Sequence, residues 1–309
     1  MTDNMVLSYI ITTRNKLLYL QETLPSLLND PRPDEEVLIV DGASTDGTRQ
    51  YLADLLQARK IQYYASEPDI GEAHGLNRAL LQTRGKFIKV ITDDDVFSYP
   101  TIRSVCQFMQ SNPDVDVVGT ETATLVGPDG EIASKNESPS YSYWNTNKAA
   151  PLAFCGLGLM IRRSALPAIG LFDVTYTAVD TEYSRRISNL AATEGSQLGL
   201  AWYSGITAVQ VLHASSNSKK QLRRIYEDYR RLGMRYRSYR SVKDCLSNSI
   251  YQLTEAAVLH SEETRYSKHI KRMYLCPSDK VIENFEKCKL WLAEYNALNP
   301  GQFLSDSTV

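Results

Sequence analysis

The chain has 309 residues, a formal net charge of −2 and an apolar content of 43%, which fits one large domain or a domain with an appendage. A charge this close to zero excludes proteins that bind nucleic acid or membranes mainly through their overall charge. The five cysteines form no C-x-x-C pair, so neither a zinc site nor a disulfide framework is indicated.

Apolar runs and helical periods alternate through the first 120 residues. The expected strands are 5–13, 35–42, 61–66, 85–92 and 114–126, and the expected helices are 16–30, 44–57, 71–83 and 101–113. Pro25 lies inside the first helix and predicts a kink or an early stop there. This β-α-β-α order predicts an α/β fold with a mostly parallel sheet and helices on both faces.

The alternation ends after residue 120. VGPDGEI (126–132) indicates a hairpin turn, and the Ser, Asn and Tyr residues of 134–147 indicate loops laid over the sheet edge. Helical periods dominate from Ser218 onward, with Pro277 as an expected break. We therefore expect a mixed second half that is followed by a helical C-terminal region.

Polar residues follow each of the first four expected strands, at 12–15, 41–44, 67–69 and 93–95. Because ligands of parallel α/β sheets bind at the carboxyl ends of the strands, we expect these groups to share one edge of the sheet. A turn, a helix cap or a solvated loop explains each group alone. Their joint occurrence at four strand ends favours a binding site.

The adjacent acids Asp93, Asp94 and Asp95 end an apolar strand and call for a positive partner. Hard cations such as Mg²⁺ and Mn²⁺ prefer carboxylate and phosphate oxygens. The pattern therefore predicts a nucleotide diphosphate held with a divalent metal, which would stabilise the charge on a departing diphosphate. Arg14 would add a phosphate contact or serve as a surface ion-pair partner. No P-loop motif is present.

The segments TTRN (12–15), VDGASTDGT (40–48), EPDIGEAHGLNRAL (67–80) and TDDD (92–95) resemble, in order and spacing, the inverting glycosyltransferases of family 2. That family has the GT-A fold. The resemblance covers residues 5–218. It implies metal-dependent transfer of a sugar from a nucleotide-diphospho-sugar, most simply a UDP-sugar, to an acceptor hydroxyl in polysaccharide or glycolipid assembly.

Three later segments extend the resemblance. GLMIRRSALPAIGLFD (158–173), AVDTEYSRRI (178–187) and VLHASSNS (211–218) are similar to the acceptor-side, acidic and late-histidine segments of the family. The implied organisation is a glycosyltransferase domain over 1–218 and a helical extension over 219–309. Within the domain, a nucleotide-sugar half at about 1–120 precedes an acceptor half at about 120–218.

By position, the resemblance implies a nucleotide pocket. Its members in this sequence are Thr12, Arg14, Asp41, Asp69, Gly71, Arg78 and Asp93. Many family members carry a second acid directly after the first one of VDGAS, where this chain has Gly42. The contact with the base therefore stays open.

The resemblance also implies an acid-x-acid metal motif, with Mn²⁺ or Mg²⁺ as the cofactor. One register places Thr92 and Asp94 on this motif, and another places Asp93 and Asp95 there. We favour Asp94 as the metal ligand with Asp93 toward the ribose, and Asp95 is a second ligand or a structural residue. His213 resembles the family histidine that contacts the diphosphate or the metal, although a lone histidine is as readily structural.

Asp180 falls on the general base of the family. An inverting transfer needs one because the acceptor hydroxyl must lose its proton as it attacks the anomeric carbon. Glu182 and Arg186 would support this base, or bind the acceptor and the diphosphate. The alternative is a helix start with Asp180 as its cap, and the two roles are compatible.

Residues 219–240 interleave tyrosines with many lysines and arginines. A solvated basic face on the catalytic domain or a contact in a homo-oligomer explains this pattern, and we favour that interpretation. The alternative is a peripheral contact with anionic lipid headgroups, where a lipid-linked acceptor would be met. No nucleic-acid-binding module accompanies the patch, so no nucleic acid partner is expected. A leader and an apolar run of ~18 residues are absent from the sequence, so we expect a cytoplasmic protein.

Two other functions compete with glycosyl transfer. A sugar nucleotidyltransferase would need a glycine-rich, arginine-bearing loop after the first strand, and TTRNKLLYL (12–20) does not provide it. A catalytically silent nucleotide-sugar-binding or scaffold protein of the same fold would be expected to lose Asp180 or the acidic triple. Both are present, so we favour the enzyme.

Overall fold

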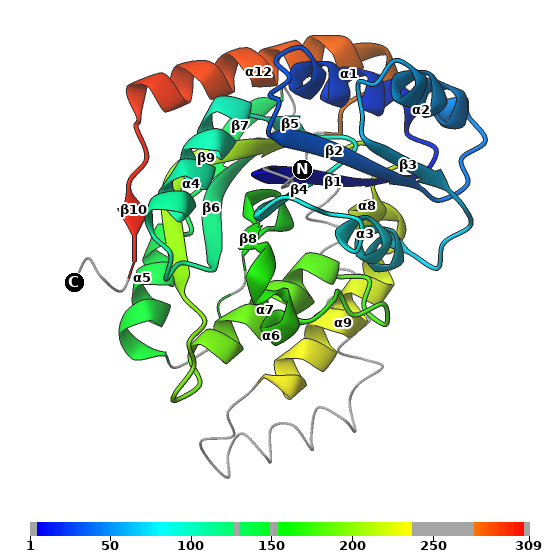
Figure 1. Ribbon diagram of the computed structural model, residues 1–309. Coiled ribbons are helices and arrows are strands. Elements are labelled where there is room, and N and C mark those ends of the chain that lie inside the picture. The colour runs from blue at the N-terminus through cyan, green and yellow to red at the C-terminus, as the bar shows by residue number, and fades with distance from the viewer. Residues whose placement is uncertain (1–4, 127–129, 149–151, 153, 237–274, 306–309) are drawn as a thin grey trace.

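Figure 1 shows the computed structural model of the chain, which describes residues 5–126, 130–148, 152, 154–236 and 275–305. Its described strands form one sheet in the order β10-β9-β6-β8-β4-β1-β2-β3, and β5 and β7 pair with β9 and β6. The strands are β1 (Leu7–Thr13), β2 (Glu35–Asp41), β3 (Tyr63–Ser66), β4 (Phe87–Ile91), β5 (Val96–Phe97), β6 (Val117–Val126), β7 (Glu131–Lys135), β8 (Met160–Arg162), β9 (Leu200–Gln210) and β10 (Phe303–Leu304).

Helices connect and cover these strands. They are α1 (Leu17–Leu28), α2 (Thr48–Gln57), α3 (Glu72–Leu80), α4 (Tyr99–Ser111), α5 (Ser138–Asn147), α6 (Leu166–Ile169), α7 (Val179–Ala191), α8 (Asn217–Lys220), α9 (Leu222–Arg235) and α12 (Val281–Leu298), with the 3-10 turns η1 (Gly156–Gly158), η2 (Arg163–Ala165) and η3 (Ser278–Lys280). None of the described helices is both long and apolar enough to span a bilayer.

The first half of the chain is the predicted parallel sheet. β1 pairs in parallel with β2 and β4, and β2 pairs in parallel with β3. Thr13 lies opposite Asp41, and Asp41 lies opposite Ser66, so these strands end at one edge of the sheet. This arrangement confirms the predicted α/β class and gathers the polar strand ends.

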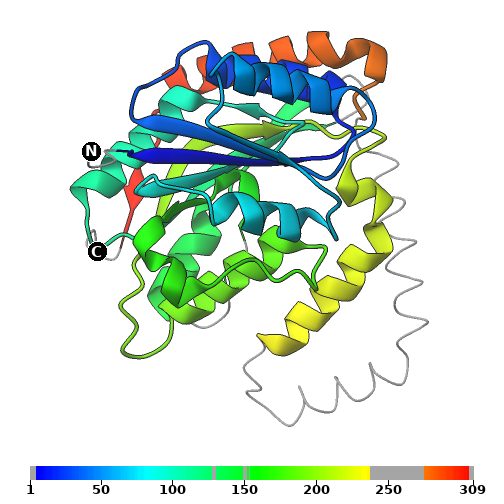
Figure 2. The same cartoon turned by 45° about the vertical axis from the view of Figure 1, so that its right-hand side comes forward.

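Two groups of helices cover the two faces of the sheet. Apolar side chains of α1, α2 and α4 pack on one face, and those of α3, α5, α6 and α7 pack on the other. In Figure 1, α1 and α2 lie above the sheet and α3, α6 and α7 lie below it, and the second view keeps the two groups apart (Figure 2). The odd and even residues of β1 face different clusters, as the period of a strand requires.

The second half of the chain joins the same sheet. β8 is antiparallel to β4 and β6, whereas β6 and β9 are parallel. The predicted hairpin is confirmed, because β7 pairs antiparallel with β6, although residues 127–129 lie outside the described residues. The prediction of loops over 134–147 is wrong, since 138–147 form α5.

A buried acid explains α5. The carboxylate of Glu121 accepts hydrogen bonds from the backbone N–H groups of Glu137 and Ser138, both at 2.7 Å, so a distant strand satisfies the start of the helix. Tyr141 and Trp144 then bury their rings under it. This polar stretch forms a helix because the fold buries two of its aromatic side chains and a carboxylate from another strand caps its start.

Of the two alternatives predicted at Pro25, the early stop is wrong, since α1 continues to Leu28 and Pro25 lies inside it. The predicted break at Pro277 agrees with the structure, where η3 and α12 follow it. Part of the predicted C-terminal helical region, 237–274, lies outside the described residues.

The described C-terminal residues pack on the sheet. Val281, Phe285, Cys288 and Leu292 of α12 form a buried cluster with side chains of α1, β5, β6 and β9, and Figure 1 shows α12 beside α1. β10 pairs antiparallel with β9, and the ring of Phe303 stacks on Phe108 of α4 at 3.7 Å. The predicted domain boundary at 218 stays a prediction.

Candidate functional site

A cleft of about 1040 Å³ opens at the carboxyl edge of the parallel strands. It is bounded by the ends of β1 and β4, the start of α3, the start of α7 and one side of α9. The predicted site residues in its lining are Thr12, Arg14, Asp69, Gly71, Asp93, Asp94, Asp95, Asp180 and His213. The predicted residues outside its lining are Asp41, Arg78, Glu182 and Arg186.

Asp41 holds the loop that follows β2. Its fully buried carboxylate accepts hydrogen bonds from the Ser44 backbone N–H at 3.0 Å and from the Ser66 hydroxyl at 2.6 Å. The Ser44 hydroxyl donates to the same carboxylate and accepts the Asn15 N–H at 2.7 Å. Asp41 therefore positions the loops after β1, β2 and β3. A direct contact with a nucleotide stays a prediction.

Asp69 fills the space beside Gly42. A Cβ atom on Gly42 would lie 2.4 Å from Asp69 Oδ2 and 3.3 Å from Arg14 Cδ. The Gly71 N–H donates to Asp69 Oδ1 at 3.2 Å, and Gly71 has a φ of 138°, which favours glycine. The absence of a side chain at Gly42 thus lets Asp69 reach the place where the family's second acid begins.

Arg78 lies on α3 and pairs with Glu67 at 3.1 Å. The side chain of Arg78 is largely buried, and its Nη1 atom has no hydrogen-bond partner among the described residues. This geometry makes Arg78 a brace between α3 and the end of β3. Its predicted contact with a nucleotide is not tested.

Asp95 fixes the end of β9. Its Oδ1 accepts the Val211 N–H at 2.7 Å, and its Oδ2 accepts the Thr92 hydroxyl at 2.6 Å. Burial, followed by the neighbouring charge of Asp94, raises the pKa of Asp95 to about 8. Both oxygens are occupied, so the geometry favours the structural alternative for Asp95 over metal ligation.

Lys16, Asp94 and His213 form a buried polar cluster at the cleft wall. The Lys16 ammonium donates to Asp94 Oδ2, and His213 Nε2 lies 2.8 Å from the same oxygen. Lys16 Nζ lies 3.1 Å from His213 Nε2. Burial alone would raise the pKa of Asp94, but the hydrogen bond from His213 and the charge of Lys16 lower it. Asp94 is therefore a carboxylate with two partners of its own.

Hydrogen bonds to the other ring nitrogen assign the tautomer of His213. The Ser215 N–H donates to His213 Nδ1 at 3.2 Å, so Nδ1 is an acceptor and Nε2 carries the proton that Asp94 accepts. Burial lowers the pKa of His213, which keeps the ring neutral. The ring is fully buried and stacks on Tyr19 at 3.7 Å.

These contacts test the predicted metal set. A divalent ion needs free lone pairs that point toward it, but Nε2 of His213 is protonated and both oxygens of Asp95 accept hydrogen bonds. Asp94 Oδ2 is shared by Lys16 and His213. Across the described residues, no three His, Cys, Asp or Glu side chains are grouped to hold a metal. As arranged, these residues do not fit the implied ion.

Asp180 is the second residue of α7 and lies in the cleft lining. Its carboxylate accepts the Thr181 N–H at 2.7 Å and the Gly156 N–H at 3.2 Å. A Cβ atom on Gly156 would lie 2.9 Å from Asp180 Cβ, so glycine permits this approach. The first turn of a helix stabilises a carboxylate. Asp180 is thus held in place at the cleft by two backbone donors.

Glu72 shares the cleft lining with Asp180 and the acidic triple. It lies in the cleft lining at the start of α3 and is open to solvent in the cleft. Reduced access to bulk water, and then the charges of Asp180, Asp93 and Asp94, raise the pKa of Glu72. Burial and the charge of Asp94 likewise raise the pKa of Asp93, to about 7. The acids at the end of β4 and at the starts of α3 and α7 therefore line one cleft.

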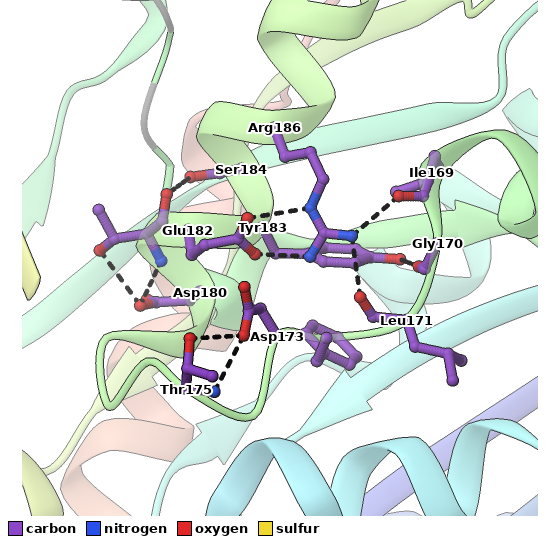
Figure 3. Close-up of polar contacts among 12 residues, drawn as sticks. Ile169, Gly170, Leu171, Asp173, Thr175, Asp180, Glu182, Tyr183, Ser184 and Arg186 are labelled. Atoms are coloured by element: carbon purple, nitrogen blue, oxygen red, sulfur yellow. Dashed lines mark hydrogen bonds and ion pairs between the residues drawn. The ribbon is translucent and has the colours of Figure 1, made fainter. Parts of the chain in front are cut away.

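Glu182 and Arg186 form a buried ion pair behind Asp180. The Arg186 guanidinium donates to both oxygens of Glu182, at 3.0 and 2.5 Å, and its Nη1 donates to the carbonyls of Ile169 and Leu171 (Figure 3). Glu182 is 1% exposed. Their geometry supports the predicted role of bracing the base, because they fix the loop before α7, and neither reaches the cleft.

The sequence analysis missed two positioning groups. Lys16 follows the TTRN segment directly, so its position before α1 was a usable signal. Asp228 of α9 accepts the N–H groups of Thr177 and Ala178, at 2.5 and 3.0 Å, just before α7. Its signal was an acid in an otherwise basic segment. The same helix contributes Arg224 and Arg231 to the cleft lining.

Comparison with known proteins agrees with this geometry. The family model described as Glycosyl transferase family 2 matches residues 8–170. A candidate teichuronic acid biosynthesis glycosyltransferase, TuaG, of Bacillus subtilis (strain 168) is 30% identical over 105 residues, or 34% of this chain and 42% of that protein. A poly-beta-1,6-N-acetyl-D-glucosamine synthase of Staphylococcus epidermidis is 20% identical over 196 residues, or 59% of this chain and 45% of that protein. The chain spans less than half the length of both relatives.

Solved structures share the architecture. The S. aureus TarS 1–349 complex with UDP-GlcNAc matches with a TM-score of 0.57 and 19% identity, over 74% of this chain and 66% of that one. The mannosyltransferase PcManGT of Pyrobaculum calidifontis, in complex with GDP-Man and Mn²⁺, matches with a TM-score of 0.54 and 17% identity, over 95% and 87%. At these identities the likeness shows the fold, which confirms the predicted GT-A class.

Proposed function

This chain belongs to glycosyl transferase family 2, and we propose that it moves a sugar from a nucleotide-diphospho-sugar to a hydroxyl of a glycan or lipid-linked acceptor. The observation that carries the proposal is the placement of Asp180 in the same cleft as Asp93 and Asp94. The acidic strand end serves the donor, and Asp180 serves the acceptor. The shared cleft brings the two substrates together.

The comparisons support a donor of this class. One structural neighbour was solved with UDP-GlcNAc and another with GDP-Man. We propose a UDP-sugar, and GDP-sugars are the second class to test. The names of two relatives refer to teichuronic acid and to a poly-N-acetylglucosamine, which supports an acceptor in polysaccharide assembly.

The proposed reaction is a single displacement with inversion. The acceptor oxygen forms a bond to the anomeric carbon as the bond from that carbon to the diphosphate oxygen breaks, and the departing diphosphate takes the electron pair. Asp180 takes the hydroxyl proton. The hydrogen bonds from Thr181 and Gly156 hold its carboxylate while it does so.

The family resemblance implies Mn²⁺ or Mg²⁺, and one neighbour was solved with Mn²⁺. The ion would supply positive charge at the departing diphosphate. Because Lys16 and His213 already contact one oxygen of the Asp94 carboxylate, no step of the proposed reaction uses the ion.

A membrane contact through 219–240 is the weaker part of the proposal. In the described residues of this segment, Arg224 and Arg231 line the cleft. This placement supports a role near an acceptor more than docking on a lipid surface.

Release of nucleotide diphosphate tests the proposed function. Purified protein is incubated with UDP-GlcNAc or GDP-Man, and nucleotide release is compared with that of Asp180→Asn. We expect about a 10²- to 10⁴-fold lower rate in the variant, the usual contribution of a general base. Asn at 180 keeps the shape of the side chain, so far-UV circular dichroism and the melting temperature should be unchanged. Full turnover by a folded Asp180→Asn protein would contradict the assignment of the base.

A further inference from the structure

We propose that Lys16 is the resident cation of the diphosphate site and takes the charge-neutralising role that the family resemblance gives to a divalent ion. This inference rests on the proposed function, because the anion it names is the diphosphate of the donor. All protein residues of the proposed diphosphate site belong to this chain.

The position of the ammonium carries the inference. Lys16 lies between β1 and α1, directly before the first residue of the helix, and its side chain is 8% exposed. Its Nζ contacts Asp94 Oδ2 and lies 3.1 Å from His213 Nε2 and 5.5 Å from the centre of the Tyr19 ring. The ammonium thus lies beside two of the three residues that were predicted to ligate the ion, Asp94 and His213.

Charge makes the ammonium and a divalent ion competitors. Both would rely on the negative charge of Asp94, whose Oδ2 the ammonium already contacts, and two cations held at one carboxylate repel each other strongly in a buried site. The ammonium contacts this carboxylate directly, and both side chains are largely buried. An ion at Asp94 would therefore have to bind against the charge of the lysine.

The ammonium also has donors to spare. It carries three N–H groups, and Asp94 accepts one of them. His213 Nε2 carries its own proton and points it at Asp94, so it is not an acceptor for Lys16. Among the described residues, no other acceptor of Lys16 occurs. Two N–H groups of a charged donor therefore remain for phosphate oxygens in the cleft, which Lys16 lines together with Arg14.

These facts define what Lys16 does in the transfer step. The bond between the anomeric carbon and the diphosphate oxygen breaks, and the electron pair goes to that oxygen. The Lys16 ammonium donates a hydrogen bond to the oxygen as its charge develops and keeps its proton. The proton of the acceptor hydroxyl goes to Asp180, so the step balances without a metal.

The test measures binding of UDP and GDP in EDTA and in Mn²⁺, by calorimetry and by thermal shift. Four proteins are compared: the unchanged chain, Lys16→Met, Lys16→Arg and the control Lys60→Met, whose lysine is exposed. Lys16→Met keeps the length of the side chain and removes its charge, and Lys16→Arg keeps the charge. Comparing nucleotide binding by the unchanged chain in EDTA and in Mn²⁺ already tests the inference without any variant.

We expect the unchanged chain and Lys60→Met to bind a nucleoside diphosphate equally well in EDTA and in Mn²⁺. Lys16→Met should bind it about tenfold or more weakly in EDTA, as expected for the loss of a charged hydrogen bond, and Mn²⁺ should restore binding because Asp94 is then free. Lys16→Arg should keep most of the affinity in EDTA.

Binding by the unchanged chain that is lost in EDTA and restored by Mn²⁺ would overturn the inference and leave the proposed function standing. The same holds if a folded Lys16→Met binds in EDTA as tightly as the unchanged chain. If neither nucleotide binds under either condition, the proposed function fails and the inference fails with it.

Discussion

The carboxylate of Asp228, on α9, accepts the backbone N–H groups of Thr177 and Ala178. These residues directly precede α7, whose second residue is Asp180. Ala178, the residue directly before α7, makes no side-chain hydrogen bond that caps the helix. The cap therefore comes from a different helix, α9. The basic segment 219–240 therefore helps to position Asp180, the proposed base, through its acidic residue Asp228.

Asp228→Ala should weaken both stability and turnover. Loss of a cap costs about 1 kcal/mol of unfolding free energy, up to about 2, and a displaced Asp180 should lower kcat by roughly ten- to hundredfold. Urea unfolding and nucleotide release measure the two effects. Glu227→Gln is the control, since the side chain of Glu227 is exposed and pairs with the exposed Arg223 of the same helix.

The outcome separates the two roles of α9. A variant that loses stability but keeps its turnover would show that Asp228 holds the fold and does not position Asp180. A loss of turnover in Glu227→Gln as large as that in Asp228→Ala would show that the charge of the helix, rather than the cap, is what matters.

Lys89 predicts an unusual pH dependence of stability. It is 1% exposed, its ammonium donates to the carbonyls of Leu157 and Leu159, and burial lowers its pKa to about 7. Between pH 7 and the ordinary pKa of about 10.4, the unfolded chain binds a proton that the folded chain does not. The contribution of Lys89 to stability should therefore rise with pH across this window.

Comparison with Lys89→Met isolates this contribution. The unfolding free energy of the unchanged chain minus that of Lys89→Met should rise by at most about 1.4 kcal/mol per pH unit between pH 7 and 10. Urea unfolding at three pH values measures it, and Lys86→Met, with an exposed lysine, should show no such trend. A flat difference between the unchanged chain and Lys89→Met would mean that Lys89 stays protonated in the fold.

Gly42 and Asp69 predict a reciprocal pair of variants. Gly42→Asp restores the acid that many family members carry, but its Cβ would lie 2.4 Å from Asp69 Oδ2. Overpacking of this kind costs about 1–3 kcal/mol, so the affinity for UDP should fall about tenfold or more. Gly42→Asp combined with Asp69→Ala should bind UDP more tightly than either single variant.

Calorimetry with UDP measures these affinities. Gly233→Ala is the control, because a Cβ at Gly233 meets nothing within 4 Å among the described atoms. Additive losses in the double variant would show that the two positions do not share one space in the nucleotide pocket.

The parallel half of the fold could be predicted from the sequence, since its strands are continuous apolar runs and its helices have clear periods. The rule that ligands bind at the carboxyl ends of such strands placed Thr12, Asp69 and Asp93 in one cleft, whereas Asp180 was assigned by the family resemblance. That rule uses only the order of the elements, which local patterns reveal. α5 was missed because its cap, Glu121, comes from another element.

The direction of each carboxylate could not be predicted. Asp94 and Asp95 are neighbours in sequence, yet one meets Lys16 in the cleft and the other turns to the N–H of Val211. Which way an acid points depends on the donors that the folded chain brings near it. The same is true of Asp41, whose partner Ser44 follows β2 and whose partner Ser66 ends β3.

The backbone of His213 pairs with Cys276, and the Cys276 N–H donates to Leu212 at 2.7 Å. Backbone pairing thereby joins a histidine of the cleft wall to a segment that begins more than sixty residues later in the chain. A shortened or chimeric version that ends with the family motifs would lose this backbone pairing together with α12 and β10. The residues that carry the family motifs therefore do not form a unit that is separable from the C-terminal part of the chain.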